Sequence, residues 1–194
     1  MTAVDEPAPK VFARAVASVR AWQPPAHIQI YEIPAPRRIA PHAFALAAVV
    51  NRDEETIAHA RLILLHDPGR PDSWHGPLRL VTYLSVPLPP VRMVRPERTD
   101  VIWTWFTDAL TRTGARFTAA GGTVTGTYST KCGDLRESSP LWTNLHQHDR
   151  DSSAAVELRA SWTPLTNDLT THLRGWSHLL TATARLTPDS AVDA

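Results

Sequence analysis

Apolar residues recur along the chain with two different periods, and the period changes where prolines cluster. Steps of three and four residues predict amphipathic helices over residues 10–23, along 101–110 up to Gly114, and over 169–186. Alternation, or a short continuous apolar run, predicts strands over residues 27–33, 43–50, 56–65, 78–86, 117–130 and 154–162. Proline fixes φ and lacks an amide donor, so its clusters mark the connections between these elements.

The predicted element order is α-β-β-β-β-α-β-β-α. Short turns between consecutive strands imply antiparallel pairing, and residues 43–50 and 56–65 are expected to form a hairpin. The predicted fold class is therefore α+β, with a single antiparallel sheet of about six strands and three helices packed on one face. The length of 194 residues suits a single domain over 1–194. That domain would carry an N-terminal tail at 1–9, a long polar loop at 133–152 and a C-terminal tail at 188–194. Within 117–130, Gly121-Gly122 predicts a bulge or kink.

Charge narrows the range of partners. The formal net charge is only +1, which makes nucleic acid an unlikely partner on electrostatic grounds alone. Two of the 20 basic residues are lysines, Lys10 and Lys131, and the others are arginines. This bias fits either the codon usage of a GC-rich genome or selection for the guanidinium fork, and composition does not separate the two. The start of the chain lacks a signal-peptide pattern and the longest apolar run, 43–50, is too short to span a bilayer, so we expect a cytoplasmic protein that does not enter the membrane.

No catalytic or cofactor-binding motif is present. The cluster His146, His148 and Asp149 has no accompanying HExxH or CxxC pattern, and we interpret it as part of a solvated loop rather than a metal site. Cys132 is the only cysteine and lacks the sequence context of a nucleophile. Phosphate-binding glycine loops and the GxSxG elbow are also missing. The sequence favours a non-enzymatic role with no metal and no cofactor, and leaves the question of catalytic activity open.

A row of hydroxyl groups is the first candidate binding site. Thr123, Thr125, Thr127 and Ser129 occupy alternate positions of one predicted strand, so their side chains share a face. One interpretation is the solvated side of a half-buried sheet, where threonine is common. The other is an open binding face to which Arg159 and Glu157 of the last strand contribute. Arg79 would join this face in one possible strand register.

The tryptophans are the second candidate. Apolar stripes contain Trp22, Trp105, Trp162 and Trp176, which we predict to be core residues. Three others lie outside the stripes: Trp103 on a helix, and Trp74 and Trp142 in polar loops. Tryptophan is enriched at interaction hot spots, which makes these three candidate contact residues. Alternatively, each ring folds back and clamps its own loop.

Four stretches resemble one protein family when taken together. They are Pro34-Ala-Pro-Arg-Arg-Ile-Ala-Pro41, Leu62-Ile-Leu-Leu-His-Asp-Pro-Gly69, Phe117-Thr-Ala-Ala-Gly-Gly-Thr-Val-Thr125 and Leu158-Arg-Ala-Ser-Trp-Thr-Pro164. The chain is identified by them, from about Phe12 to Leu186, as a member of the actinobacterial domain of unknown function 3000 family. That family is uncharacterised, so the resemblance implies no catalytic residue. It implies a genomic context that includes a ribonuclease D-like exonuclease. The element order is also similar to that of secretion-chaperone-like folds, an analogy of fold alone.

Two hypotheses follow. The first is a non-enzymatic adaptor that binds an unknown protein partner or small ligand through the sheet face or through Trp74, Trp103 and Trp142. A homodimer is one form of this hypothesis. The alternative is an RNA-metabolism-associated factor or enzyme with an arginine-lined cleft. The first predicts a flat, partly apolar patch, and the second predicts arginines that converge on one concavity.

Overall fold

The computed structural model describes residues 9–52, 55–88, 96–135 and 152–187. Its helices and strands follow the predicted order. They are α1 (Lys10–Ala21), β1 (Ile28–Ile33), β2 (His42–Arg52), β3 (Glu55–His66), β4 (Leu78–Leu88), α2 (Pro96–Arg112), β5 (Phe117–Thr130), β6 (Ser152–Pro164) and α4 (Thr170–Ala184). Short 3-10 turns lie at η1 (Asp72–Trp74) and η3 (Gly133–Leu135). Within these described residues, the prediction of three helices and one six-stranded antiparallel sheet is confirmed.

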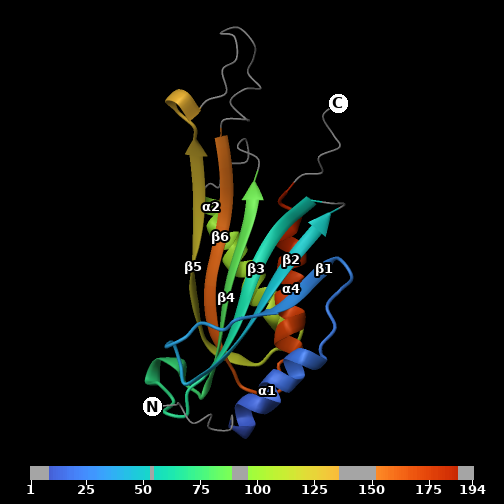
Figure 1. Ribbon diagram of the computed structural model, residues 1–194, viewed down its shortest axis with the longest axis vertical. Helices are drawn as coiled ribbons and strands as arrows, with labels where there is room; N and C mark the ends of the chain where they lie inside the picture. The colour runs from blue at the N-terminus through green and yellow to red at the C-terminus, as the bar shows by residue number, and fades with distance from the viewer. Residues whose placement is uncertain (1–8, 53–54, 89–95, 136–151, 188–194) are drawn as a thin grey trace.

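The sheet begins as a meander and ends with one inserted strand. Strands β1 to β4 lie side by side in chain order, and β6 lies between β4 and β5. All neighbouring pairs are antiparallel, including the expected hairpin of β2 with β3. Strand β5 is therefore an edge strand although it comes late in the sequence, and it forms one border of the sheet in Figure 1.

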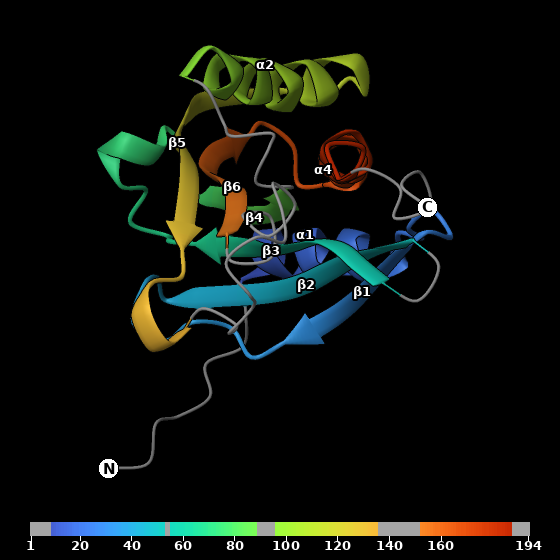
Figure 2. The ribbon, with the colours of Figure 1, turned by 90° about the horizontal axis from the view of Figure 1, so that it is seen from above.

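The helices cover one face of the sheet. Figure 2 shows α2 and α4 on the same side, and α1 is joined to the start of α4 by a bond from the amide of Leu169, the residue before α4, to Ser18 Oγ, at 2.9 Å. Residues of even number in β4 and β6 point to this side and are mostly buried, whereas the odd-numbered residues are mostly half-buried or exposed. Phe106 of α2 meets Trp162 of β6 edge to face, with ring centroids 5.2 Å apart. Residues of all three helices and of β1, β2, β3, β4 and β6 join one hydrophobic cluster.

A glycine allows α2 and α4 to approach closely. A Cβ at Gly175 of α4 would lie 2.9 Å from the Cα of Leu110 and 3.0 Å from the carbonyl oxygen of Ala109. Helix α2 ends as the sequence predicts, because Gly114 adopts a φ of 73°, a conformation that costs glycine little. None of the described helices is long and apolar enough to cross a membrane.

Strand β5 contains the predicted irregularity. The pairing with β6 shifts between Thr118 and Gly121, so the bulge lies at Ala119-Ala120, immediately before the two glycines. Ala119 has a φ of 49°, which is unusual for a residue with a side chain. Arg79 of β4 holds this point, since its Nη1 donates to the carbonyl oxygen of Ala119 at 2.8 Å.

Candidate functional site

The face of the sheet that lies opposite the helices carries the predicted hydroxyl row. We call Thr123, Thr125 and Thr127 the threonine row; all three are exposed, as is Ser129. The strand register places Thr123 opposite Arg159 and Thr125 opposite Glu157. The structure therefore brings together the threonines and the two β6 side chains that the sequence analysis considered with them.

The next strands extend this surface. Arg159 lies opposite Tyr83 of β4, and Tyr83 lies opposite Arg61 of β3. His59 of β3 is also exposed, and its ring centroid lies 6.2 Å from that of Tyr83. We call Arg61, His59, Tyr83, Glu157 and Arg159 the outer-face cluster. It runs across three adjacent strands and continues into the threonine row on a fourth.

Hydrogen bonds hold the centre of the outer-face cluster in one arrangement. The Tyr83 hydroxyl donates to Glu157 Oε1 at 2.8 Å, and Arg159 Nη2 donates to Glu157 Oε2 at 3.1 Å. The Arg159 guanidinium also lies over the Tyr83 ring, 5.3 Å from its centroid. Glu157 thus accepts one bond on each carboxylate oxygen and is only 25% exposed at its side chain.

Arg159 is fixed but still accessible. Its side chain is 67% exposed. Within the described residues, the bond to Glu157 uses only Nη2 of the guanidinium. The carbonyl oxygen of Arg61 accepts a bond from the Thr82 hydroxyl, whereas its exposed guanidinium has no hydrogen bond or ion pair within the described part of the chain. Two arginines therefore flank Tyr83 with donors that face solvent, and one half-buried carboxylate partly offsets their charge. Guanidinium groups whose donors face solvent can bind a carboxylate or a phosphate in a bidentate manner.

Arg79 lies farther along the same face and has a structural role. Besides Ala119, it contacts Thr163 Oγ1 at 3.1 Å and Ser161 Oγ at 2.7 Å. Burial lowers the pKa of the Arg79 guanidinium, and neutral oxygens replace water around it. The observed register places Arg79 on this face, but its donors are directed to the sheet itself.

The three candidate tryptophans do not come together. Trp74 is half-buried in η1, and its carbonyl oxygen accepts a bond from the Thr163 hydroxyl at the end of the outer face. Trp103 is half-buried on α2, on the helical side, where its ring centroid lies 5.2 Å from that of Phe106. Trp142 lies outside the described residues. Of the predicted core tryptophans, Trp162 and Trp176 are fully buried, while Trp22 and Trp105 pack partly buried against the core.

Tyr83, Arg61 and His59 are the site residues that sequence reasoning missed. Alternation along residues 78–86 already places Tyr83 and Arg79 on one face, and alternation along 56–65 does the same for His59 and Arg61. The missing information was the register between strands, which decides that Tyr83 lies beside Arg159. That register joins residues 74 positions apart in the case of Tyr83 and Glu157.

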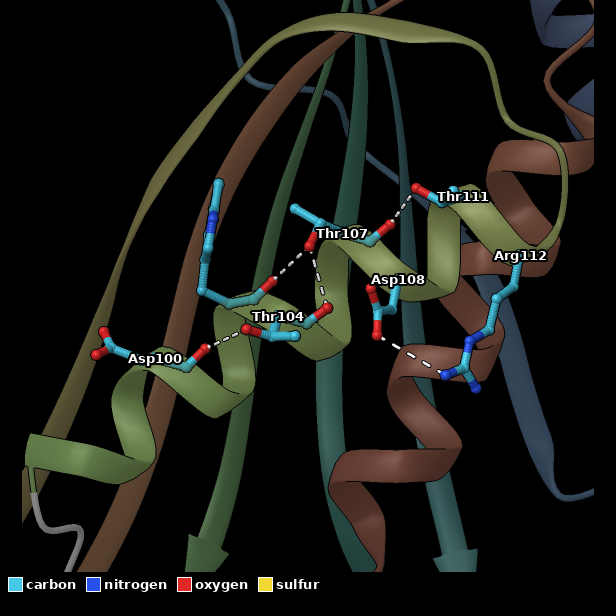
Figure 3. Close-up of polar contacts among 7 residues, drawn as sticks. Asp100, Thr104, Thr107, Asp108, Thr111 and Arg112 are labelled. Atoms are coloured by element: carbon cyan, nitrogen blue, oxygen red, sulfur yellow. Dashed lines mark hydrogen bonds and ion pairs between the residues drawn. The ribbon is translucent and has the colours of Figure 1, made fainter.

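A groove between α2 and α4 is the main competing site. Polar side chains on its α2 wall already contact groups of the same helix, as Figure 3 shows. The groove itself measures about 380 Å³ and is lined by Thr104, Trp105, Asp108, Ala109, Arg112, His178 and Ala182. The Thr104 hydroxyl donates to the Asp100 carbonyl at 2.9 Å, and Asp108 lies 3.8 Å from Arg112. These contacts engage Thr104, Asp108 and Arg112 with groups of their own helix rather than direct them into the groove.

Two buried histidines lack one hydrogen-bond partner each within the described residues, His66 at Nδ1 and His172 at Nε2. Burial lowers the pKa of His66, with the neighbouring His42 acting in the same direction. Burial lowers the pKa of His172 to about 4, against a smaller opposite effect of Asp168. Neither belongs to a cluster of metal-binding side chains, since the described residues contain no group of three such ligands. His146, His148 and Asp149 lie outside the described part.

Comparison with known proteins gives one match. The family model described as "Protein of unknown function (DUF3000)" matches residues 8–192, nearly the whole chain, and confirms the family resemblance that the four sequence stretches indicated. No curated protein and no solved structure matches the chain.

Proposed function

We propose that this chain, which belongs to the DUF3000 family, is a non-enzymatic binding protein whose outer-face cluster holds an acidic group of a protein partner. The observation that carries the proposal is the state of Arg159. Its guanidinium is oriented by Glu157 and Tyr83, yet most of the side chain faces solvent. We place this activity in the cytoplasm, on the basis of the sequence pattern described above.

The side chain of Arg159 is preorganised for binding. A free arginine loses side-chain entropy when it binds, whereas Arg159 already occupies one position over the Tyr83 ring. Arg61 offers a second cation on the other side of the same ring. The threonine row beside Arg159 adds hydroxyl groups that donate or accept hydrogen bonds. A flat surface with two cations, an aromatic ring and hydroxyls fits an extended acidic segment of a polypeptide.

The proposal is tested with a fluorescein-labelled oligoglutamate peptide and fluorescence anisotropy at low salt. We expect the wild-type chain to bind the peptide, and Arg159→Glu or Arg61→Glu to weaken binding by at least about tenfold, because each variant replaces attraction by repulsion. Arg14→Glu is the matched control: Arg14 is exposed on α1, and the variant makes the same change in net charge away from the face. Equal loss in all three variants would show that only bulk charge matters, and absence of peptide binding by the wild type would contradict the proposal.

The RNA hypothesis is a second arm of the same experiment. The pair of arginines that flank Tyr83 is the observation that favours it, because arginine and tyrosine also contact phosphates and bases. A labelled oligo-uridine of matched length replaces the peptide. The alternative would be favoured if the chain bound the RNA in a salt-dependent manner but did not bind oligoglutamate. The RNA binding would also have to be lost in Arg159→Glu and kept in Arg14→Glu.

A further inference from the structure

Strand β5 presents a long edge to solvent. It has 14 residues and pairs with β6 on one side, whereas no other described strand lies on its second side. From Gly122 to Thr130 every residue except Val124 is exposed. In an edge strand alternate residues direct their backbone amide and carbonyl groups away from the sheet. A row of backbone groups that point away from the sheet is a template for another extended strand.

The two edges of the sheet differ in their protection. Strand β1, at the opposite border, has six residues and carries Glu32, which pairs with Arg20 of α1 at 2.8 Å. Prolines at 24–25 and 34 bracket it. Charge, short length and proline are the usual means by which natural edges avoid pairing. Strand β5 contains no Asp, Glu, Lys, Arg or Pro at all between Phe117 and Thr130. The edge of β5 therefore lacks the features that prevent pairing with another strand.

The sequence of β5 complements its own copy. When two β5 strands run antiparallel with Thr125 at a twofold axis, Thr123 lies opposite the partner's Thr127. Thr–Thr pairs across antiparallel strands are favourable. On the other face of the strand, Val124 lies opposite the partner's Gly126, and the half-exposed Tyr128 lies opposite the partner's Gly122. Each large side chain thus faces a glycine, which leaves it room to pack.

Charge also favours a second copy over a foreign strand. An uncharged strand meets no like charge when it pairs with itself, and the whole chain carries a net charge of only +1. A charged segment would gain nothing from this edge, because β5 offers it no opposite charge. The occupant that fits best is a neutral strand rich in threonine, and β5 itself has that composition.

We propose that two copies of this chain form a homodimer by antiparallel β5–β5 pairing about a twofold axis at Thr125. The axis is perpendicular to the sheet, so both copies keep their helices on one side and the two sheets become continuous. This inference goes beyond the proposed function and does not depend on it. Its consequence for that function is that the outer-face clusters of both copies lie on one common face.

Cysteine cross-linking tests the register. In a Cys132→Ser background, Thr125→Cys is expected to form a disulfide with its own copy, because directly opposite Cα atoms of antiparallel strands lie about 4.5–5.5 Å apart. Ser129→Cys in the same background is the matched control, since Ser129 is also exposed on β5. In the proposed register the two Ser129 positions are roughly 27 Å apart along the strands and cannot form a bond. Equally fast cross-linking of both variants, or of Ser129→Cys alone, would overturn the register.

Light scattering with an edge variant tests the interface. The wild type is expected to have the mass of a dimer, and Thr125→Lys that of a monomer, because two lysines would face each other at the axis. Gln29→Lys places the same charge on the exposed surface of the other edge strand and is expected to remain dimeric. Circular dichroism shows whether each variant is folded, and cross-linking remains decisive if Thr125→Lys is not. A monomeric wild type, or a dimer that Thr125→Lys leaves intact, would overturn the proposal.

Discussion

The buried imidazole of His172 makes stability depend on pH in a way that is open to direct test. His172 is fully buried on α4, and Trp162 Nε1 donates to its Nδ1 at 3.1 Å. Nδ1 is therefore an acceptor, and in the neutral ring the proton resides on Nε2, which has no partner among the described residues. Protonation would add a charge in the core and also remove the acceptor of the Trp162 bond. Both effects favour the neutral ring, in agreement with a pKa of about 4.

The size of the effect follows from linkage between protonation and folding. The pKa of His172 falls from 6.5 in its ordinary state to about 4 in the folded chain. Below pH 6.5 the unfolded chain binds a proton that the folded chain does not, so the free energy of unfolding decreases as the pH falls. The free energy of unfolding keeps its full value well above pH 6.5. By pH 4 it has fallen by about 3 kcal/mol, at 1.36 kcal/mol per pKa unit. A typical domain is stable by about 5–15 kcal/mol, so this loss is large.

The assay is urea unfolding followed by tryptophan fluorescence at several pH values between 7.5 and 4. His172→Asn keeps an acceptor in the region of Nδ1 and removes the titrating ring. The variant is expected to be less stable than the wild type at neutral pH, because it leaves a small cavity, but to lose less stability towards pH 4. His178→Asn removes an exposed histidine of the same helix and serves as the control.

Either of two results would contradict a lowered pKa for His172. One is a wild-type chain and a His172→Asn variant whose free energies of unfolding fall in parallel from pH 7.5 to pH 4. The other is an NMR titration in which the His172 ring takes up its proton near pH 6.5 in the folded chain. Either would mean that the imidazole is charged at a normal pH despite its burial.

Two further variants test packing and backbone geometry. Gly175→Ala should lower stability by about 1–3 kcal/mol in thermal unfolding, because the added Cβ overlaps Leu110; Gly121→Ala, which meets no atom within 4 Å, should have a much smaller effect. Arg79→Lys should destabilise the chain by about 1.5–3 kcal/mol in urea, because a lysine does not replace all the bonds that Arg79 makes around Ala119. Wild-type stability of either variant would show that the contact contributes little.

Sequence patterns predicted the fold well where they depend on local geometry. Alternation along β6 assigned Trp162 to the core and Arg159 to the opposite face, and both assignments are confirmed. Side chains of a strand point to alternate sides whatever the strand pairs with, so this information is present in any short window. Gly114 at the end of α2 is a similar case, because a helix end requires a residue that adopts positive φ at little cost.

The order and register of the strands depend on residues far apart in the sequence, and local patterns did not predict them. The insertion of β6 between β4 and β5 decides that Arg159 meets Tyr83, and no local pattern encodes that choice. Trp103 illustrates a different limit. It lies off the apolar stripe, yet its ring reaches Phe106 one turn away and is half-buried, because residues three apart are neighbours on a helix surface.

The position of β6 also orders the events of synthesis. The meander from β1 to β4 is complete well before β6 leaves the ribosome, since Tyr83 and Glu157 are 74 positions apart. Until then the apolar residues of β4 have an open neighbouring edge, and both α4 and its packing against α2 are still absent. The nascent chain therefore passes through a period in which apolar core residues of β1 to β4 are exposed to other chains. Closure of the sheet by β6 assembles the outer-face cluster, and α4, which follows β6 in the chain, then completes the core.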